Sequence, residues 1–183
     1  MEKVVLPPAR PRRTEEEVRR QCPWATTGKH GRKERNVVTS LEMDPVLMEK
    51  NNERFQQTYR TIEENEVRFE EIGTEDADYL IIAFGTVARI ALKAIEDARE
   101  QGIKVGLLRP ITLWPFPTKE IERLSHKVKG ILVVELNAGQ MIQDVRLANE
   151  GRVPVAHFGR MGGIVPSPTE ILDALNRELI ENA

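Results

Sequence analysis

Two glycine-containing turns and one carboxylate follow apolar runs of this sequence, where α/β proteins often do chemistry. Gly85-Thr86 lies between the run 79–84 and a helical pattern, an arrangement in which backbone N–H groups bind phosphate. The spaced glycines of the dinucleotide-binding and P-loop patterns are absent. A tight strand-to-helix turn is therefore the favoured interpretation of Gly85-Thr86, and phosphate binding is the less favoured one.

A second loop, Gly159–Val165, contains three glycines and one arginine after another apolar run. Glycines leave the backbone N–H groups approachable, and the guanidinium of Arg160 can bind a carboxylate or phosphate through two parallel hydrogen bonds. The same loop could instead turn sharply and let a neighbouring chain approach Gly162 and Gly163 closely. These two interpretations have equal weight from the sequence.

The third candidate is Glu135, which ends an apolar run and is followed by Asn137 and Gln140. Its carboxylate is expected either to accept local N–H groups and an arginine, or to be exposed at an interface. General acid–base catalysis needs a positioned partner. His126 and His157 have no evident one, so both are interpreted as structural histidines.

Residue patterns typical of a self-contained active site are missing. No nucleophile elbow and no two-histidine metal spacing occurs, and Cys22 is the single cysteine. We therefore predict no catalytic, cofactor-binding or metal-binding residue in this chain.

Four short apolar runs must position these candidates. They are rich in Val, Ile and Leu without alternation, which is typical of parallel strands covered by helices on both faces. The runs are 79–84, 104–109, 131–135 and 153–158. Helices are predicted over about 86–101, 118–127 and 137–149 and from Pro168 onward, with Thr118, Asn137 and Ser167 as caps. Residues 66–72 alternate, as a half-exposed edge strand does.

The front of the chain differs from this α/β part. Residues 1–40 carry ten Lys/Arg and five Asp/Glu, and residues 41–78 carry four and twelve. Thr14 can cap a short helix to Gln21, and Asp44-Pro45 begins a helix over about 45–65 with a thin apolar stripe. We predict an extended, basic, loosely held linker at 1–43, a linker helix and edge strand at 44–72, and an α/β domain at 73–183.

Composition restricts where and with what the chain works. The 40% hydrophobic content supports one modest core. No apolar run reaches the length of a membrane span, and no signal peptide is recognised. One cysteine fits a reducing, cytoplasmic location. The basic stretch lacks interleaved aromatics and precedes an acidic one, so no nucleic-acid partner is expected.

Three motifs together resemble one known family. They are Leu108–Pro117 (LRPITLWPFP), Val133–Gln140 (VVELNAGQ) and Phe158–Gly163 (FGRMGG). In this order and spacing they resemble the C-terminal part of the α subunit of 2-oxoacid:ferredoxin oxidoreductases, of the 2-oxoisovalerate or 2-oxoglutarate type. The stretch 109–115 is more distantly similar to the C-terminal domain of transketolase-like enzymes. The resemblance implies a three-layer α/β/α fold with a five-stranded mixed sheet, four strands parallel and one antiparallel.

The resemblance also implies a role inside a larger enzyme. The parent reaction is the oxidative decarboxylation of a 2-oxo acid with coenzyme A and ferredoxin, and its chemistry belongs to thiamine diphosphate, Mg²⁺ and Fe–S clusters outside this chain. This chain would be a domain fragment or split gene product, inactive alone, that assembles with the β, γ and δ subunits in a homo- or hetero-oligomer.

No catalytic residue of the family falls on these motifs. Nine residues are instead expected to face a neighbouring subunit or a ligand: Arg109, Trp114, Phe116, Glu135, Asn137, Gln140, Arg160, Gly162 and Gly163. The alternative is an independent small α/β module that binds a nucleotide or another anionic ligand at Gly85-Thr86 or Gly159–Gly163.

Overall fold

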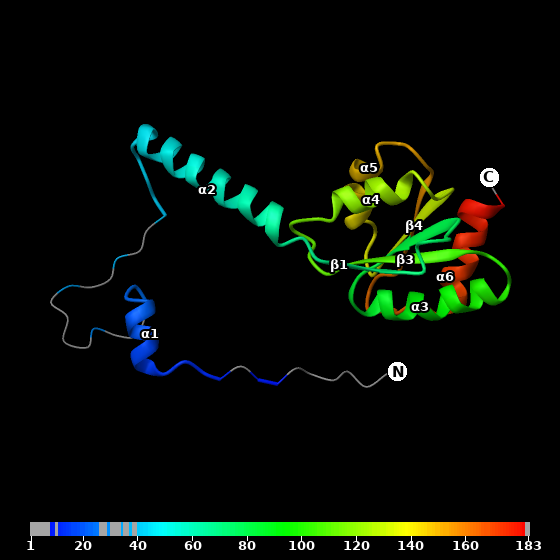
Figure 1. Cartoon of the computed structure of the whole chain (residues 1–183), viewed down its shortest axis with the longest axis horizontal. Helices are drawn as coiled ribbons and strands as arrows, with labels where there is room; N and C mark the ends of the chain where they lie inside the picture. Colours follow the sequence, from blue (N-terminus) through cyan, green and yellow to red (C-terminus); the bar gives the residue numbers. More distant parts are fainter. Residues whose placement is uncertain are drawn as a thin grey trace. The chain divides into compact units, whose positions relative to one another are not determined.

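The computed structural model describes residues 8–9, 11–25, 29, 34, 37 and 40–181. By its internal contacts the chain divides into two units, Met1–Asn52 and Glu53–Ala183. Figure 1 colours both units along the sequence. The second unit holds all the strands and is the part that positions the candidate residues.

A five-stranded sheet forms the middle of this second unit, with the strand order β1-β3-β2-β4-β5. β1 runs antiparallel to β3, and the other neighbours are parallel. The strands are β1 (Phe69–Ile72), β2 (Tyr79–Ile82), β3 (Val105–Pro110), β4 (Gly130–Glu135) and β5 (Val155–Gly159). The predicted mixed sheet with one antiparallel edge strand is confirmed, although that edge strand begins at Phe69 rather than at residue 66.

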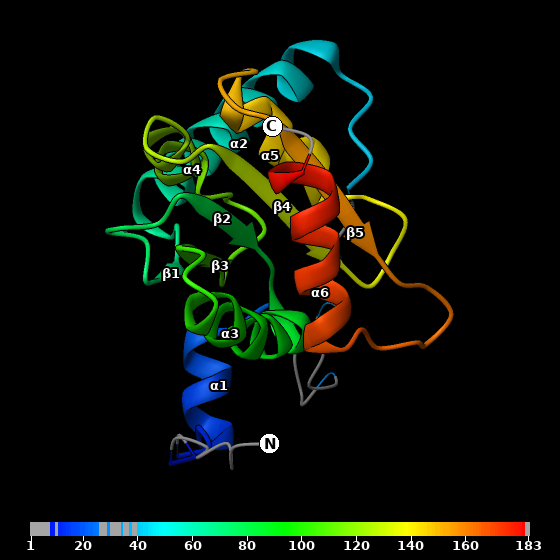
Figure 2. The same ribbon diagram turned by 90° about the vertical axis from the view of Figure 1, so that its right-hand side faces the viewer.

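Helices cover both faces of the sheet, which is why its central strands read as continuous apolar runs. α3 (Gly85–Glu100) and α6 (Pro168–Leu175, extended by a π-helical turn over Asn176–Ile180) pack on one face. α4 (Thr118–Ser125) and α5 (Met141–Asn149) pack on the other. Figure 1 shows α4 and α5 across the sheet from α3, and Figure 2 shows α6 beside α3. The three-layer prediction is confirmed.

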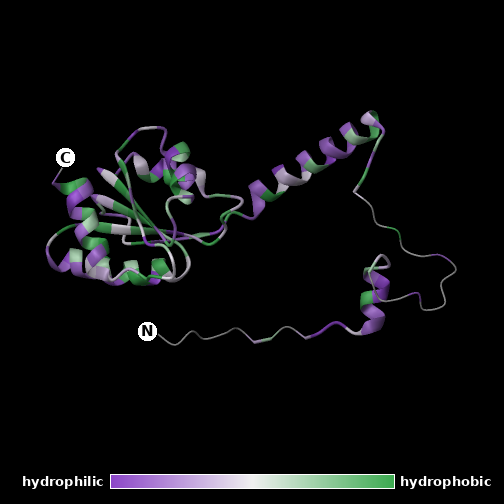
Figure 3. Cartoon of the chain, turned by 180° about the vertical axis from the view of Figure 1, so that it is seen from behind, coloured by the Kyte–Doolittle hydropathy of each residue, from purple (hydrophilic) through white to green (hydrophobic). Residues whose placement is uncertain are grey.

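The core is split by the sheet into two apolar layers. Ile81, Leu107 and Leu132 face α3 and α6, whereas Leu80, Leu108 and Ile131 face α4 and α5. In Figure 3 the strands are mainly green, while the outer sides of the helices carry most of the purple. Each strand therefore contributes alternate residues to each layer, as the pleat requires.

The helix α2 (Pro45–Asn65) has no buried residue and is mostly purple and white in Figure 3. Asp44 caps it as predicted, since its Oδ1 accepts the N–H groups of Val46 at 2.8 Å and Leu47 at 3.2 Å. In the first unit, Thr14 forms the predicted capping box at the start of α1 (Glu15–Gln21). No helix in the described ranges is long and apolar enough to cross a membrane.

Two predicted helix starts are confirmed and two are wrong in the α/β part. Ser167 and Glu170 form the predicted capping box of α6, and Gly102 follows α3 with a left-handed φ of +82°. Thr118 is the first helical residue of α4 and makes no cap, because Pro117 occupies that position. Asn137 does not cap α5 either, as described below. The expected loose attachment of residues 1–43 concerns a stretch that mostly lies outside the described residues.

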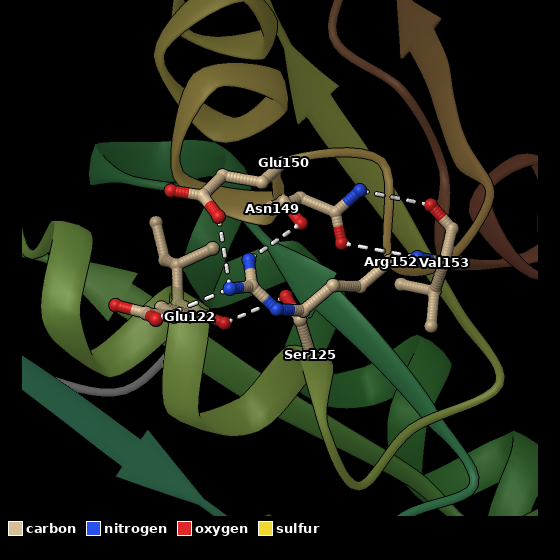
Figure 4. A network of polar contacts seen from close by, with 7 residues as sticks. Glu122, Ser125, Asn149, Glu150, Arg152 and Val153 are labelled. Atoms are coloured by element: carbon tan, nitrogen blue, oxygen red, sulfur yellow. Dashed lines mark hydrogen bonds and ion pairs between the residues drawn. The ribbon is translucent and has the colours of Figure 1, made fainter.

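Arg152 joins the ends of α4 and α5 at the amino edge of the sheet (Figure 4). Its Nη2 lies 3.2 Å from a carboxylate oxygen of Glu122 and 2.9 Å from one of Glu150, and its Nη1 donates to the carbonyl of Asn149. The Asn149 side chain donates to the carbonyl of Val153 at 2.9 Å. This network fixes the amino edge and leaves the opposite, carboxyl edge for function.

Candidate functional site

The candidate residues lie at the carboxyl edge of the sheet, where all four parallel strands end. α3 follows β2 on one face, whereas α5 follows β4 on the other. β2 and β4 are neighbours, so the chain departs in opposite directions from two adjacent strand ends. Open α/β sheets bind ligands at such a switch point.

Glu135 is the centre of this edge, and its side chain is fully buried. Its carboxylate accepts the backbone N–H groups of Gln140 at 3.2 Å, Met141 at 2.8 Å and Ile142 at 3.2 Å. These are the N–H groups that the start of a helix leaves without intrahelical partners. A strand-end carboxylate thus caps the next helix, and its negative charge lies at the positive end of the α5 dipole.

This cap explains why the predicted capping box of Asn137 and Gln140 is wrong. α5 begins at Met141, and the side chain of Gln140, its N-cap residue, makes no capping bond. Asn137 instead accepts the N–H of Gly139 at 2.7 Å and donates its amide to Glu135 at 3.1 Å. The predicted local N–H partners of Glu135 are present. The predicted arginine is replaced, within the described structure, by a histidine.

That histidine is His157, which the sequence had indicated as structural and without a mate. Its Nε2 lies 3.6 Å from Glu135 Oε2 and is buried without a hydrogen bond among the described residues. The register of β4 and β5 sets Val133 beside His157 and Glu135 beside Gly159. Only the strand pairing shows this neighbourhood, so the separate sequence motifs could not predict it.

Gly159 is needed here because two groups crowd it. A Cβ at this position would lie 2.2 Å from the carbonyl oxygen of Asn137 and 2.6 Å from Cε1 of His157. The predicted close approach at this glycine is therefore made by the chain's own β4–α5 turn. Gly162 and Gly163 differ, since they adopt φ values of +69° and +86° with open space around the missing Cβ.

Both candidate arginines have carboxylate partners in the chain. Arg109 pairs with Glu70 across β3 and β1 at 2.6 Å. Arg160 pairs with Glu170 at the start of α6 at 2.9 Å, and its backbone N–H donates to the carbonyl of Glu135 at 3.2 Å. The hydrogen bonds from Ser167, followed by the charge of Arg160, hold the pKa of Glu170 below its usual value of 4.5. Arg160 thus connects the β5 loop to α6.

The loop after β3 places its two aromatic residues differently. Trp114 is 53% exposed and meets Tyr59 of α2 edge to face, with ring centroids 5.6 Å apart. Phe116 is half-buried and packs against the apolar layer under α4 and α5. Trp114 is therefore a surface residue, whereas Phe116 is shared between the core and the site.

A pocket of about 160 Å³ opens at this edge. Its lining comes from the ends of β2, β3 and β4 and from the first turn of α5: Phe84, Leu113, Phe116, Glu135, Gln140, Met141 and Asp144. Three of the nine candidates line it, namely Phe116, Glu135 and Gln140. Asn137 and Arg160 reach it only through their hydrogen bonds to Glu135. Arg109, Trp114, Gly162 and Gly163 lie outside the lining. Gly85 has a φ of +61° and starts α3, as the favoured tight turn requires.

A family model for pyruvate:ferredoxin oxidoreductase core domain II matches residues 77–171, which include this whole edge. The chain belongs to this family. Two relatives of this core domain II chain are from Methanothermobacter marburgensis. It is 42% identical to the ketoisovalerate oxidoreductase subunit VorB over 81% of the chain, and 35% identical to the 2-oxoglutarate synthase subunit KorA over 56%.

These relatives are longer than this chain, which covers 42% of VorB and 27% of KorA. A similar solved structure is the 2-oxoglutarate:ferredoxin oxidoreductase from Magnetococcus marinus with 2-oxoglutarate, coenzyme A and succinyl-CoA bound. It superposes with a TM-score of 0.64 at 21% identity, over 75% of this chain and 24% of that one. This similarity establishes a shared fold.

The residues of this edge do not fit the cofactors expected in the parent enzyme. Fe–S clusters are held by several thiolates, and the chain has one cysteine. No cluster of three or more His, Cys, Asp or Glu suited to a metal occurs among the described residues. The pocket has two carboxylates in its lining and no basic side chain, which does not suit a diphosphate.

Proposed function

We propose that this chain is a structural and assembly domain of a thiamine-diphosphate-dependent 2-oxoacid:ferredoxin oxidoreductase. The parent enzyme would convert a 2-oxo acid and coenzyme A to acyl-CoA and CO₂, with two electrons passed to ferredoxin. Thiamine diphosphate, Mg²⁺ and Fe–S clusters would supply that chemistry from other domains and subunits. The chain itself would hold those parts together in the reducing cytoplasm.

The observation that carries the proposal is the core domain II match over residues 77–171. The matched range contains all three motifs of the sequence analysis except the start of α6's extension, and the structure folds them onto one edge of one sheet. The polar groups of that edge support a structural role. Glu135 is occupied by helix capping, and Arg109 and Arg160 by ion pairs within the chain.

The alternative of a free-standing module for anionic ligands is less well supported. The pocket at the switch point has an acidic lining, and the arginine of the glycine-rich loop already has a carboxylate partner. An anion would have to displace Glu170 or approach two carboxylates.

The test is affinity purification of the tagged chain from its native cells, followed by identification of co-purifying subunits and an activity assay. We expect a complex that contains thiamine diphosphate and iron and reduces viologen with coenzyme A and a branched-chain 2-oxo acid or 2-oxoglutarate. The same chain, purified alone from a heterologous host, should show no such activity. A chain that purifies without partners and binds nucleotides saturably would overturn the proposal.

A further inference from the structure

The pocket at the switch point has apolar walls and an acidic rim. Phe84, Phe116 and Met141 form walls from three successive strand ends, and Leu113 continues them at the surface. Its volume of about 160 Å³ is close to that of an engineered cavity of about 150 Å³ that binds benzene. The pocket thus has room for one group of side-chain size.

The charges of the lining all have one sign. Glu135 and Asp144 are the ionisable residues of the lining, and both are acidic. Glu135 is occupied by the N–H groups of α5. Asp144 is exposed and makes no hydrogen bond or ion pair within the described part of the chain, and the amide side chain of Gln140 is exposed beside it. A cationic group at the mouth would find an acceptor with free lone pairs.

The walls also suit a cation better than an anion. Aromatic faces attract ammonium and guanidinium groups. Lysine and arginine side chains place their apolar stems along hydrophobic surface and keep their charged ends at polar positions. The chemistry that matches the pocket is therefore an apolar stem that ends in a positive charge.

We propose that this pocket receives an arginine or lysine side chain of a partner protein. The stem lies against Phe84, Phe116 and Met141, and the charged end meets Asp144 and Gln140. A protein is favoured over a free amine because the same edge presents the exposed apolar residues Leu136, Met161 and Ile164. Apolar surface around a polar anchor is typical of protein interfaces.

The first experiment is an NMR titration of the isolated chain with three small probes: n-butylguanidinium, n-butanol and butyrate. n-Butylguanidinium is expected to shift the amide signals of Gln140–Asp144 saturably in the millimolar range. n-Butanol should bind several-fold more weakly, and butyrate should not saturate. Asp144→Asn should reduce n-butylguanidinium binding to the n-butanol level, while the control Asp173→Asn on α6 should not. Equal binding of butyrate, or no saturable shift with n-butylguanidinium, overturns the proposal.

The second experiment tests the partner, which rests on the proposed function in being a neighbouring subunit. Asp144→Lys is introduced into the tagged chain in its native cells, and co-purified subunits are quantified against wild type and Asp173→Lys. We expect a loss of at least tenfold for Asp144→Lys alone. Full assembly of Asp144→Lys overturns the partner and leaves a small-cation pocket. If the wild-type chain itself recruits no subunit, the proposed function fails and the titration still decides the chemistry of the pocket.

Discussion

A single carboxylate organises the carboxyl edge of the sheet. Glu135 ends β4, and its side chain accepts three consecutive backbone N–H groups at the start of α5 and the amide of Asn137. Charge-assisted hydrogen bonds are roughly twice as strong as neutral ones. Burial of this charge is thus offset by its own local structure, which leaves Glu135 as a positioning residue for the pocket.

Glu135→Gln is expected to destabilise the chain by about 2 kcal/mol, because a neutral amide weakens several bonds and turns its NH₂ group toward helix donors. The measurement is urea unfolding at neutral pH. Glu96→Gln, in an exposed pair with Lys93 on α3, serves as control and should stay within about 0.5 kcal/mol of wild type. Equal stability of Glu135→Gln and wild type would mean that the carboxylate does not cap α5.

Gly159→Ala is expected to destabilise by about 2 kcal/mol or more, since the new Cβ meets the backbone of Asn137, which cannot move without the α5 cap. Gly162→Ala is the matched comparison. It has open space and a left-handed φ, so it should cost about 1 kcal/mol from backbone strain alone. Thermal melts of the two variants, with the larger loss at Gly162, would contradict the close approach described for Gly159.

At the scale of elements, most of the fold could be predicted from the sequence. Apolar runs between glycines and prolines gave all four parallel strands to within about two residues, because strands covered on both faces leave a strong pattern. Helix caps formed by a local Ser, Thr or Asp were also predicted. The start of α5 was missed because its cap is a strand residue, and a local Asn with a capping-box spacing was the stronger sequence signal.

Spatial relations between elements were beyond the sequence. The neighbourhood of Glu135 and His157 arises from the register of β4 and β5, and the pocket arises from the strand order β3-β2-β4. Neither leaves a trace in the spacing of residues. The nine candidates were therefore predicted as a group at one edge, whereas the lining residues Phe84, Leu113, Met141 and Asp144 were not.

The cap of α6 is an element whose stability can be measured directly. Ser167 accepts the N–H of Glu170 and Glu170 accepts the N–H of Ser167, at 3.2 and 2.8 Å. Ser167→Ala should destabilise by about 1 kcal/mol and Ser167→Gly by only a few tenths. Urea melts of both variants test this order. Equal losses, or none for alanine, would argue against the cap.

The same cap makes part of the stability depend on pH. The pKa of Glu170 is lowered in the folded chain by its bonds to Ser167, so the carboxylate stabilises the fold above the ordinary value of 4.5. This contribution is lost as the pH falls from that value through the lower folded pKa. The stability gap between wild type and Glu170→Gln should therefore be constant from pH 7 to about 5 and close below it. A gap that is independent of pH down to 3 would contradict the assignment.

At the scale of the whole molecule, the carboxyl edge is where a larger assembly would attach. Met161 and Ile164 are 59% and 54% exposed in a loop whose glycines leave it open on the outside. Arg160 is less suited to a test of this surface, because Arg160→Glu would place a second carboxylate beside Glu170 and loosen α6. Apolar residues without internal partners are the better probes.

The double variant Met161→Ser/Ile164→Ser is expected to leave the melting of the isolated chain nearly unchanged, since neither side chain is in the core. In the native complex it should reduce co-purified subunits at least tenfold, because central apolar residues carry much of the binding free energy of an interface. Leu147→Ser is the matched control: Leu147 is 77% exposed on α5, which runs away from the carboxyl edge, so its removal should leave assembly intact. If the control weakens assembly as much as the double variant, the interface lies over α5. If neither does, the β5 loop faces solvent in the complex, and the interface must be sought at Trp114 and α2.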